Sequence, residues 1–276
     1  MRRRTTALQV RRTERLTPHM IRVVAGGDDL AAFPDTEYTD RYVKILFPHP
    51  GVAYPQPFDM DAVRAELPRE QWPALRTYTV RAFDPAAGEL TIDFVHHGDV
   101  GLAGPWAAGA RPGDRLLLLG PGGAYAPDPT ADWHLLVGDE SALPAIGAAL
   151  ERVPAGVPVH AIIEVDGPAD ELELTSPGRL DLRWCHRDAG RSGQLVDVLA
   201  ALPFPAGRVH AFVHGEAGAV KALRRYLRVD RGLGMDRLSI SGYWRLGVDD
   251  EGWRASKREW NAAIEQEELG DPVATP

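Results

Sequence analysis

The chain has 276 residues, of which 44% are hydrophobic and 25% are charged, a composition typical of a globular protein with one large domain or two of common size. The formal net charge of -8 argues against general nucleic-acid binding. The longest aliphatic run, residues 116–119, is far shorter than the roughly 20 residues of a membrane span, and no apolar signal segment follows the N-terminal arginines, so a cytoplasmic location is expected.

Cysteine and histidine usage limits the redox chemistry that the chain can perform alone. The single cysteine, Cys185, excludes an intramolecular disulfide and a four-cysteine iron–sulfur cluster. The histidines are too scattered to predict a metal site. Any redox chemistry would therefore need a bound organic cofactor. The basic N-terminus is interpreted as a solvated strand face, formed by Arg2, Arg3, Arg4, Arg11, Arg12 and Arg15.

The first half of the chain shows strand patterns separated by turn signals, at residues 20–24, 42–47, 77–82 and 89–95. In the last of these, Leu90, Ile92 and Phe94 alternate with polar residues, as in a half-buried antiparallel strand. A long excursion rich in proline and charge, residues 48–73, interrupts the series and is expected to hold a short helix over 61–66. This half predicts a six-stranded antiparallel barrel.

After residues 120–123 the pattern changes to apolar strands that alternate with helices. The expected strands are residues 135–137, 159–164, 209–213 and 238–241, and the expected helices are 142–152, 194–201, 217–228 and 253–267. This alternation predicts a parallel, helix-covered sheet. We place the domain boundary in Pro127-Asp128-Pro129, which gives domains of residues 1–127 and 128–276.

The most informative local motif is Arg76-Thr77-Tyr78-Thr79. Strand alternation puts Arg76 and Tyr78 on one face and the two threonines on the other. An arginine can pair with phosphate, a tyrosine ring can lie against an isoalloxazine, and a threonine hydroxyl can bond a ring nitrogen. The motif therefore offers the groups that a flavin needs, although alone it could be an ordinary polar strand.

Two glycine-containing turns could meet phosphate groups. His97-Gly98 is followed by Gly101-Leu102-Ala103-Gly104-Pro105-Trp106-Ala107, where glycines before a short helix leave backbone N–H groups free for an anion. In the second half, a strand runs into Gly138-Asp139-Glu140-Ser141-Ala142-Leu143, where a dinucleotide is expected. This turn is not G-x-G-x-x-G, and its two acidic side chains would repel a pyrophosphate if they pointed toward it.

These motifs occur in a fixed order together with Gly-Pro-x-Gly at 120–123 and Ser-Gly-Tyr-Trp-Arg-x-Gly at 241–247. As an ordered set, over roughly residues 15–262, they resemble the siderophore-interacting proteins, whose layout is that of the ferredoxin reductase-like flavoenzymes. The resemblance implies a flavin-binding barrel, a nucleotide-binding second domain and reduction of ferric siderophores. It assigns FAD to Arg76, Thr77, Tyr78, Thr79, His97, Gly101, Ala103, Gly104, Trp106 and Ala107, and the remaining cofactor contacts to Gly138, Asp139, Glu140, Ser141, Leu143, Gly215, Glu216, Tyr243 and Trp244.

Two positions depart from the pattern that the resemblance implies. Gly104 stands where relatives often carry a serine, which loosens one phosphate contact, and Gly122 stands where they often carry an arginine, which removes one charge from the expected substrate pocket. The basic residues that remain as candidates for binding an anionic ferric chelate are Lys44, Arg245, Lys257 and Arg258; the last two share a face of the final predicted helix with Arg254.

The implied reaction passes a hydride from NAD(P)H to FAD and then single electrons to Fe(III), with no side chain needed as a strong acid or nucleophile. We expect NADPH, because Arg187 could meet a 2′-phosphate, whereas Asp166 could take a ribose hydroxyl and favour NADH. Two alternatives stay open: a reductase that exchanges electrons with ferredoxin, and a module that binds ferric siderophores without reducing them. A monomer is expected.

Overall fold

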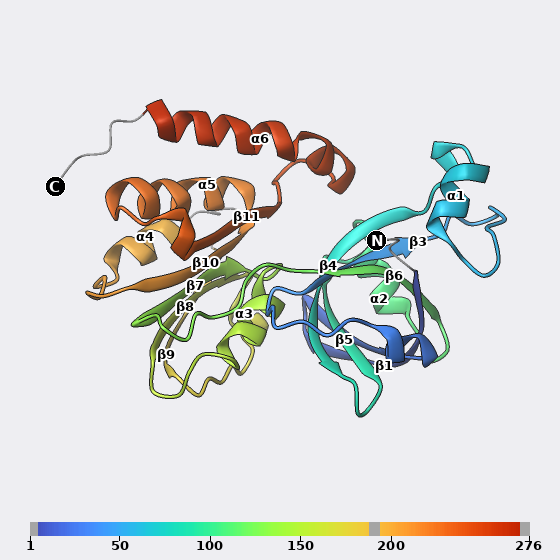
Figure 1. Cartoon of the computed structure of the whole chain (residues 1–276), viewed down its shortest axis with the longest axis horizontal. Helices are drawn as coiled ribbons and strands as arrows, with labels where there is room; N and C mark the ends of the chain where they lie inside the picture. Colours follow the sequence, from blue (N-terminus) through green and yellow to red (C-terminus); the bar gives the residue numbers. More distant parts are fainter. Residues whose placement is uncertain (1–4, 188–193, 271–276) are drawn as a thin grey trace. The chain divides into compact units, whose positions relative to one another are not determined.

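The computed structural model describes residues 5–187 and 194–270, so Arg2, Arg3 and Arg4 lie outside the described residues. The chain divides into two compact units, Met1–Ala124 and Tyr125–Pro276 (Figure 1). The sequence had placed the boundary between residues 127 and 128. Each unit is described below by itself. No helix in the described ranges is long and apolar enough to cross a membrane.

The first unit is a closed antiparallel barrel, which confirms the expected fold. Its strands follow one another around the barrel in the order β1-β2-β5-β4-β3-β6. The strands are β1 (Thr6–Thr17), β2 (Met20–Gly26), β3 (Tyr42–Phe47), β4 (Ala74–Asp84), β5 (Glu89–Val95) and β6 (Arg115–Gly122). Short helices connect them: η1 (Asp28–Ala32), α1 (Met60–Glu66), η2 (Arg69–Gln71) and α2 (Ala103–Gly109).

Alternation along the strands decides which side chains fill the barrel. Leu90, Ile92 and Phe94 of β5 are fully buried in the interior cluster, as the sequence pattern predicted. The arginines of β1 stay at the surface, where Arg12 donates to both carboxylate oxygens of Glu89 at 2.6 and 2.8 Å. The interior cluster of the barrel is therefore apolar, and these arginines of β1 face outward.

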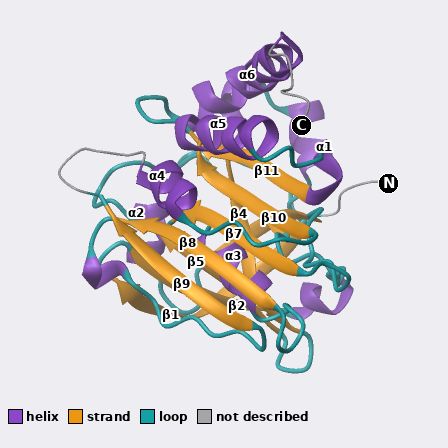
Figure 2. Cartoon of the chain, turned by 90° about the vertical axis from the view of Figure 1, so that its left-hand side faces the viewer, coloured by secondary structure: helices purple, strands orange, loops and turns teal. Residues whose placement is uncertain are grey.

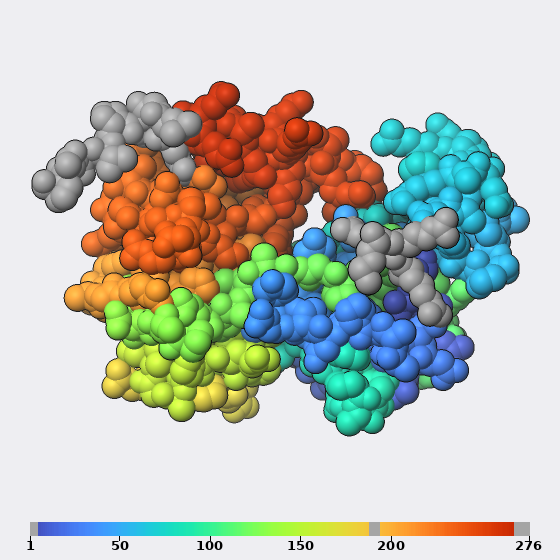
Figure 3. All heavy atoms as spheres, viewed as in Figure 1, coloured from blue at the N-terminus to red at the C-terminus, as the bar shows by residue number. Residues whose placement is uncertain are grey.

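The excursion between β3 and β4 builds a second, smaller core on the outside of the barrel. Phe58, Met60 and Val63 pack against Leu46, Leu117 and Leu119 in this cluster. The four consecutive leucines of β6 are accordingly buried on both faces, since Leu116 and Leu118 point into the interior cluster. The excursion, cyan in Figure 3, lies at the surface of the barrel unit and includes the expected short helix, now α1.

The second unit is a parallel sheet with the strand order β11-β10-β7-β8-β9, which confirms the second half of the predicted fold. The strands are β7 (Trp133–Asp139), β8 (Pro158–Val165), β9 (Arg179–His186), β10 (Val209–Glu216) and β11 (Leu238–Trp244). The helical elements are α3 (Leu143–Leu150), η3 (Pro168–Asp170), α4 (Gln194–Ala201), α5 (Ala217–Arg225), η4 (Tyr226–Asp230), η5 (Met235–Arg237) and α6 (Asp250–Gly270).

Helices cover both faces of this sheet (Figure 2). Leu199 of α4 and Leu223 of α5 pack on the face that carries Leu135 and Val137, while α3 packs on the face of Gly138. The chain builds β8 and β9 on one side of β7 and then returns to build β10 and β11 on the other. The strand order therefore reverses between β7 and β10, where ligands bind in open sheets of this kind, outside the carboxyl ends of the strands.

One histidine of β7 is fully buried, and its ring nitrogens lack hydrogen-bond partners in the described residues. His134 is 0% exposed, and neither of its ring nitrogens has a hydrogen-bond partner in the described part of the chain. Burial, and next the charge of nearby His210, lower the pKa of His134 to about 4. The unfolded chain takes up this proton near pH 6.5, so the folded state loses stability as the pH falls from about 6.5 to 4.

We expect His134→Leu to stabilise the protein. An apolar side chain of similar size removes the cost of two unsatisfied nitrogens, so the free energy of unfolding should rise by about 1–2 kcal/mol at neutral pH. Urea titrations at pH 7 and pH 5 measure both the gain and its pH dependence, and the gain should be larger at pH 5. Equal or lower stability of the variant at both pH values would contradict this account.

Candidate cofactor sites

The polar strand motif lies on β4, and two of its residues share a face with the barrel interior. In the register of β3 and β4, Arg76 is opposite Ile45 and Tyr78 is opposite Val43, and both partners are fully buried inside the barrel. Cross-strand partners share a face, so Arg76 and Tyr78 point the same way, as the alternation predicted. Both are half-buried, which leaves part of each side chain accessible.

The barrel core fixes the orientation of these two side chains. The Tyr78 ring packs against Phe94 with the ring centroids 4.5 Å apart, and Arg76 Nη1 donates to the Leu75 carbonyl oxygen at 3.0 Å. Thr77 is exposed on the outer face opposite Lys44, and Thr79 is buried. The strand thus presents a held aromatic ring beside a held guanidinium, the pair that an isoalloxazine with a phosphate group requires.

The turn after β5 offers backbone rather than side-chain contacts. Gly98 and Gly101 adopt positive φ angles of 63° and 85°, and a Cβ atom at either would lie in open space. The N-cap residue of α2, Leu102, makes no side-chain hydrogen bond to the helix, and the first turn holds no acidic residue. His97 of this turn has its ring 5.8 Å from that of His19. The backbone here is open to an anion.

The side chains of α2 face the barrel instead. Ala103 and Ala107 are buried in the interior cluster, and the Trp106 ring packs 5.8 Å from Phe47 and 5.6 Å from Phe94, measured between centroids. If this helix contacts a cofactor, its main-chain N–H groups are the available partners. An arginine, an oriented ring and an open glycine turn together fit a flavin dinucleotide.

The structure explains why glycine stands at position 104. A Cβ atom there would lie 2.9 Å from the carbonyl oxygen of Val95 and 3.3 Å from Cα of His96, both in the main chain. Any side chain would push α2 away from the end of β5.

We therefore expect Gly104→Ala to lower the thermal stability of the barrel unit and to weaken FAD binding, because the first turn of α2 shifts. The expected cost is about 1–3 kcal/mol, as for other overpacked sites. Thermal unfolding with and without added FAD measures both effects, and Gly109→Ala, where a Cβ has open space, is the matched control. A variant at 104 that binds FAD as well as the wild type would show that α2 has no part in the site.

In the second unit, Gly138 closes the packing between β7, β10 and α3. A Cβ atom at this position would lie 2.5 Å from the His214 carbonyl oxygen and 2.6 Å from Cβ of Ala142. Leu143, the first residue of α3, is buried directly behind this turn. Because position 138 has no side chain, α3 can pack closely on the sheet, as in dinucleotide-binding turns.

Asp139 points into the protein and ties three strand ends together. Its Oδ1 accepts hydrogen bonds from the Ser141 N–H at 2.9 Å and the Ser141 hydroxyl at 2.5 Å. Its Oδ2 accepts from the Glu216 N–H at 2.7 Å and from Trp244 Nε1 at 2.8 Å. The carboxylate is 2% exposed, so it faces the ends of β10 and β11 rather than a bound anion.

Glu140 is also held away from the turn. It accepts from Arg187 Nη1 at 2.7 Å and forms a second, shorter contact with Nη2, while Glu164 of β8 accepts from Arg187 Nε at 3.0 Å. The repulsion of a pyrophosphate that the sequence suggested is thus reduced, since one carboxylate is buried and the other is paired. The ion pairs of Arg187 carry no local sequence signal, because Glu140 lies 47 positions away.

The remaining sequence candidates near the carboxyl edge have structural contacts. Gly215 has a φ of 145°, and a Cβ there would lie 2.6 Å from Asp139 Oδ2. Glu216 caps α5 by accepting from the Ala219 N–H at 2.9 Å, and it also accepts from the Leu246 N–H at 3.1 Å. Tyr243 packs its ring against His214, with centroids 4.9 Å apart.

The basic candidates come from both units and differ in their burial and contacts. Lys44 belongs to β3 of the barrel unit, and Arg245 follows β11 and is exposed. On α6, Lys257 is half-buried and donates to the Ser241 hydroxyl at 2.9 Å, whereas Arg258 is exposed. Burial lowers the pKa of Lys257. The structure therefore separates Lys257 from Arg258, although they are neighbours in sequence.

Gly122 is the second position that departs from the expected family pattern, and the ring of Tyr42 fills the space that a side chain there would need. A Cβ atom on Gly122 would lie 2.5 Å from Cζ of Tyr42, so the tyrosine covers this glycine. No local sequence pattern predicts this contact, because the two residues come from different strands, β3 and β6.

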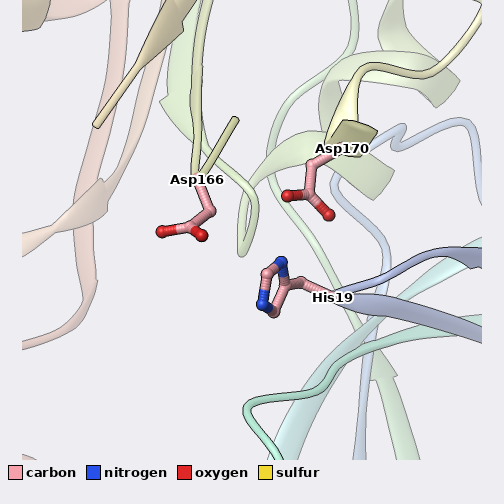
Figure 4. Close-up of side chains that lie close together, drawn as sticks. All are labelled: His19, Asp166 and Asp170. Carbon is pink, nitrogen blue, oxygen red and sulfur yellow. The ribbon is translucent and has the colours of Figure 1, made fainter. Parts of the chain in front are cut away.

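Acidic residues follow β8 in the second unit. Asp166, directly after the strand, is exposed, and Asp170 of η3 is buried (Figure 4). His19, also drawn in Figure 4, belongs to the barrel unit, in the turn between β1 and β2.

Comparison with known proteins identifies relatives along both units. The family model of the siderophore-interacting FAD-binding domain matches residues 9–125, and that of the siderophore-interacting protein matches residues 131–247. An uncharacterized protein of Mycobacterium tuberculosis is 46% identical over 92% of this chain and 94% of its own.

Named reductases are also similar. The ferric vibriobactin reductase ViuB of Vibrio cholerae is 33% identical, covering 89% of this chain and 91% of its own, and the NADPH-dependent ferric-chelate reductase of Escherichia coli is 32% identical, covering 86% and 91%. Among solved structures, the siderophore-interacting protein SipS from Aeromonas hydrophila superposes with a TM-score of 0.81 at 32% identity, over 94% of this chain and 99% of that one.

Proposed function

The chain belongs to the siderophore-interacting protein family, and from this we propose that it reduces ferric siderophores with electrons from NAD(P)H, using FAD bound in its barrel. The observation that carries the proposal is that Arg76 and Tyr78 both lie on the inner face of β4. The similarity to named ferric reductases supports an oxidoreductase.

FAD, when bound, would accept a hydride from the nicotinamide and release electrons singly, which suits a two-electron donor and a one-electron acceptor such as Fe(III). In this proposal Arg76 pairs with the flavin phosphates and Tyr78 supports the isoalloxazine ring. Thr77, Thr79 and His97 complete the flavin side, and the turn from Gly101 to Ala107 contributes main-chain N–H groups. The protein thus supplies position and charge rather than an acid or a nucleophile.

The nicotinamide nucleotide is assigned to the carboxyl ends of β7, β10 and β11. The turn from Gly138 through Ser141 to Leu143 receives the pyrophosphate, and Gly215, Glu216, Tyr243 and Trp244 flank it. The inward orientation of Asp139 supports this assignment, because it removes a negative charge from the surface of the turn. Since the reaction draws on NAD(P)H, the proposed location is the cytoplasm.

The ferric siderophore is expected to meet basic side chains. Lys44 is the barrel candidate, and Arg245, Lys257 and Arg258 are the candidates of the second unit. Lys257 is the most informative of these, because it makes no ion pair within the described residues and is held by a single hydroxyl. A half-buried ammonium without a carboxylate partner favours an anionic ligand.

The test is a steady-state assay in which a chelator specific for Fe(II) traps the product of ferric siderophore reduction. The proposal predicts about two Fe(II) ions per nucleotide oxidised, since a hydride carries two electrons. Iron-siderophore binding without nucleotide oxidation would indicate a binding module instead. Reduction that depends on added reduced ferredoxin, and not on NADH or NADPH, would indicate a protein donor.

A further inference from the structure

In a dinucleotide-binding sheet, the adenosine ribose contacts residues at the end of the second strand, which in this unit is the end of β8. In sheets of this kind, an acidic residue after the second strand bonds the 2′-hydroxyl of NAD, whereas a nearby arginine accommodates the 2′-phosphate of NADP. Here β7 is the first strand of the unit and β8, its parallel neighbour, is the second. The charged side chains described at this end include Glu164, Asp166 and Arg187, which follows β9; His186, the last residue of β9, pairs with Glu171 at 2.8 Å.

Arg187 is the basic side chain at this end that could meet a 2′-phosphate, but two carboxylates hold it. Its Nη1 bonds Glu140 at 2.7 Å and its Nε bonds Glu164 at 3.0 Å, so the fork of the guanidinium is occupied on two sides. The side chain is 17% exposed, and those of Glu140 and Glu164 are 8% and 6% exposed. Leaving either buried carboxylate without its partner is costly, so the arginine is not available to a ligand.

The charge balance at this end is negative. Two carboxylates offset the guanidinium of Arg187, and Asp166 adds a third carboxylate that is exposed. A 2′-phosphate carries nearly two negative charges and would approach a surface on which, within residues 5–187, the guanidinium of Arg187 is already paired. A ribose hydroxyl is a donor and suits the exposed carboxylate of Asp166.

We propose that the Glu140–Arg187–Glu164 ion pairs and Asp166 make this protein selective for NADH over NADPH. The inference rests on the proposed function, because it assumes that the second unit binds a nicotinamide nucleotide. It reverses the expectation from sequence, in which Arg187 favoured NADPH.

The test measures binding as well as turnover on the full-length FAD-loaded protein. Isothermal titration with adenosine 5′-monophosphate and adenosine 2′,5′-bisphosphate compares ligands that differ only in the 2′-phosphate. We expect the monophosphate to bind at least about tenfold more tightly, because the 2′-phosphate brings like charges together. NADH should reduce the flavin with a correspondingly lower half-saturating concentration than NADPH.

Variants separate the contributions. Glu140→Gln with Glu164→Gln releases Arg187 and should shift the preference toward the bisphosphate by about tenfold or more. Asp166→Ser should weaken binding of the monophosphate and leave that of the bisphosphate unchanged or improved. Glu173→Gln, an exposed position between β8 and β9, is the control for removal of one negative charge. If the double variant fails to fold, Asp166→Ser still tests the inference.

The outcomes distinguish this inference from the proposed function. Equal binding of the two adenosine ligands would overturn the selectivity and leave a reductase that accepts either nucleotide. Tighter binding of the bisphosphate would overturn it and leave a reductase that prefers NADPH. Absence of binding by either ligand would overturn it as well. Reduction of a ferric siderophore by the protein after its flavin is reduced with dithionite would then show whether the proposed function survives with another donor.

Discussion

Asp139→Ala should be among the most destabilising single substitutions in the second unit. It removes the acceptor of four hydrogen bonds, from the main chain and hydroxyl of Ser141, the main chain of Glu216 and the indole of Trp244. Each buried donor left without an acceptor costs roughly 1–3 kcal/mol, and relaxation recovers part of the sum, so we expect a loss of about 3–5 kcal/mol. The ends of β7, β10 and β11 should loosen, and nucleotide binding should weaken with them.

The pH dependence of that loss gives an independent check. Burial, and next the charge of Glu140, raise the pKa of Asp139 from the ordinary value of 3.8 to about 6. The folded state therefore holds this proton more tightly than the unfolded chain, and the contribution of Asp139 decreases as the pH rises through about 4 to 6. The cost of Asp139→Ala should then be larger at pH 5 than at pH 7.5, by about 1 kcal/mol.

Urea titration monitored by tryptophan fluorescence measures these changes, because five of the seven tryptophans lie in the second unit. Asp181→Asn, a partly exposed carboxylate of β9 that pairs with His160 and Arg183, is a suitable control and should cost much less. A loss for Asp139→Ala below about 1 kcal/mol would show that the three strand ends are held by other contacts.

Arg76→Gln should remove most of the affinity for FAD while leaving the barrel folded. The guanidinium is half-buried on the inner face of β4, and a glutamine at this position keeps a polar side chain with N–H donors. Charge-assisted hydrogen bonds to phosphate are worth about 1.5–3 kcal/mol, which corresponds to a decrease in FAD affinity of about 10- to 100-fold. Arg76→Lys keeps the charge but loses the forked geometry, so its affinity for FAD should lie between those of the wild type and Arg76→Gln.

Titration of the apoprotein with FAD, followed by quenching of flavin fluorescence, measures this affinity. Arg115→Gln removes the same charge from an exposed position on β6 of the same barrel and should bind FAD as the wild type does. Wild-type FAD binding by Arg76→Gln would place the flavin phosphates elsewhere, and the assignment of the β4 motif would be wrong.

The fold could be predicted from the sequence because its signals are local. Alternation at Leu90, Ile92 and Phe94 defines a barrel wall, and the change after residue 123 from short strands to strands separated by helices marks the second unit. β9 was not predicted. It lies at the edge of the sheet, and its polar composition, with Asp181 and Arg183, hides the strand pattern.

The candidate sites were only partly predictable, for a different reason. The motif residues could be located because each carries its chemistry within a few positions, but the partners that hold them come from distant segments. Arg187 reaches Glu140 across 47 positions, and Trp244 reaches Asp139 across 105. Sequence shows which groups are present, whereas the tertiary fold determines that Asp139 turns inward and that Arg187 is paired.

The most direct test of the central claim is an anaerobic visible spectrum of the FAD-loaded protein, recorded before and after NADH or NADPH and again after a ferric siderophore. We predict that the flavin bands bleach on addition of the nucleotide, faster with NADH, and return on addition of the ferric siderophore as Fe(II) forms. A protein that cannot be loaded with FAD, or a reduced flavin that the ferric siderophore leaves reduced, would contradict the account.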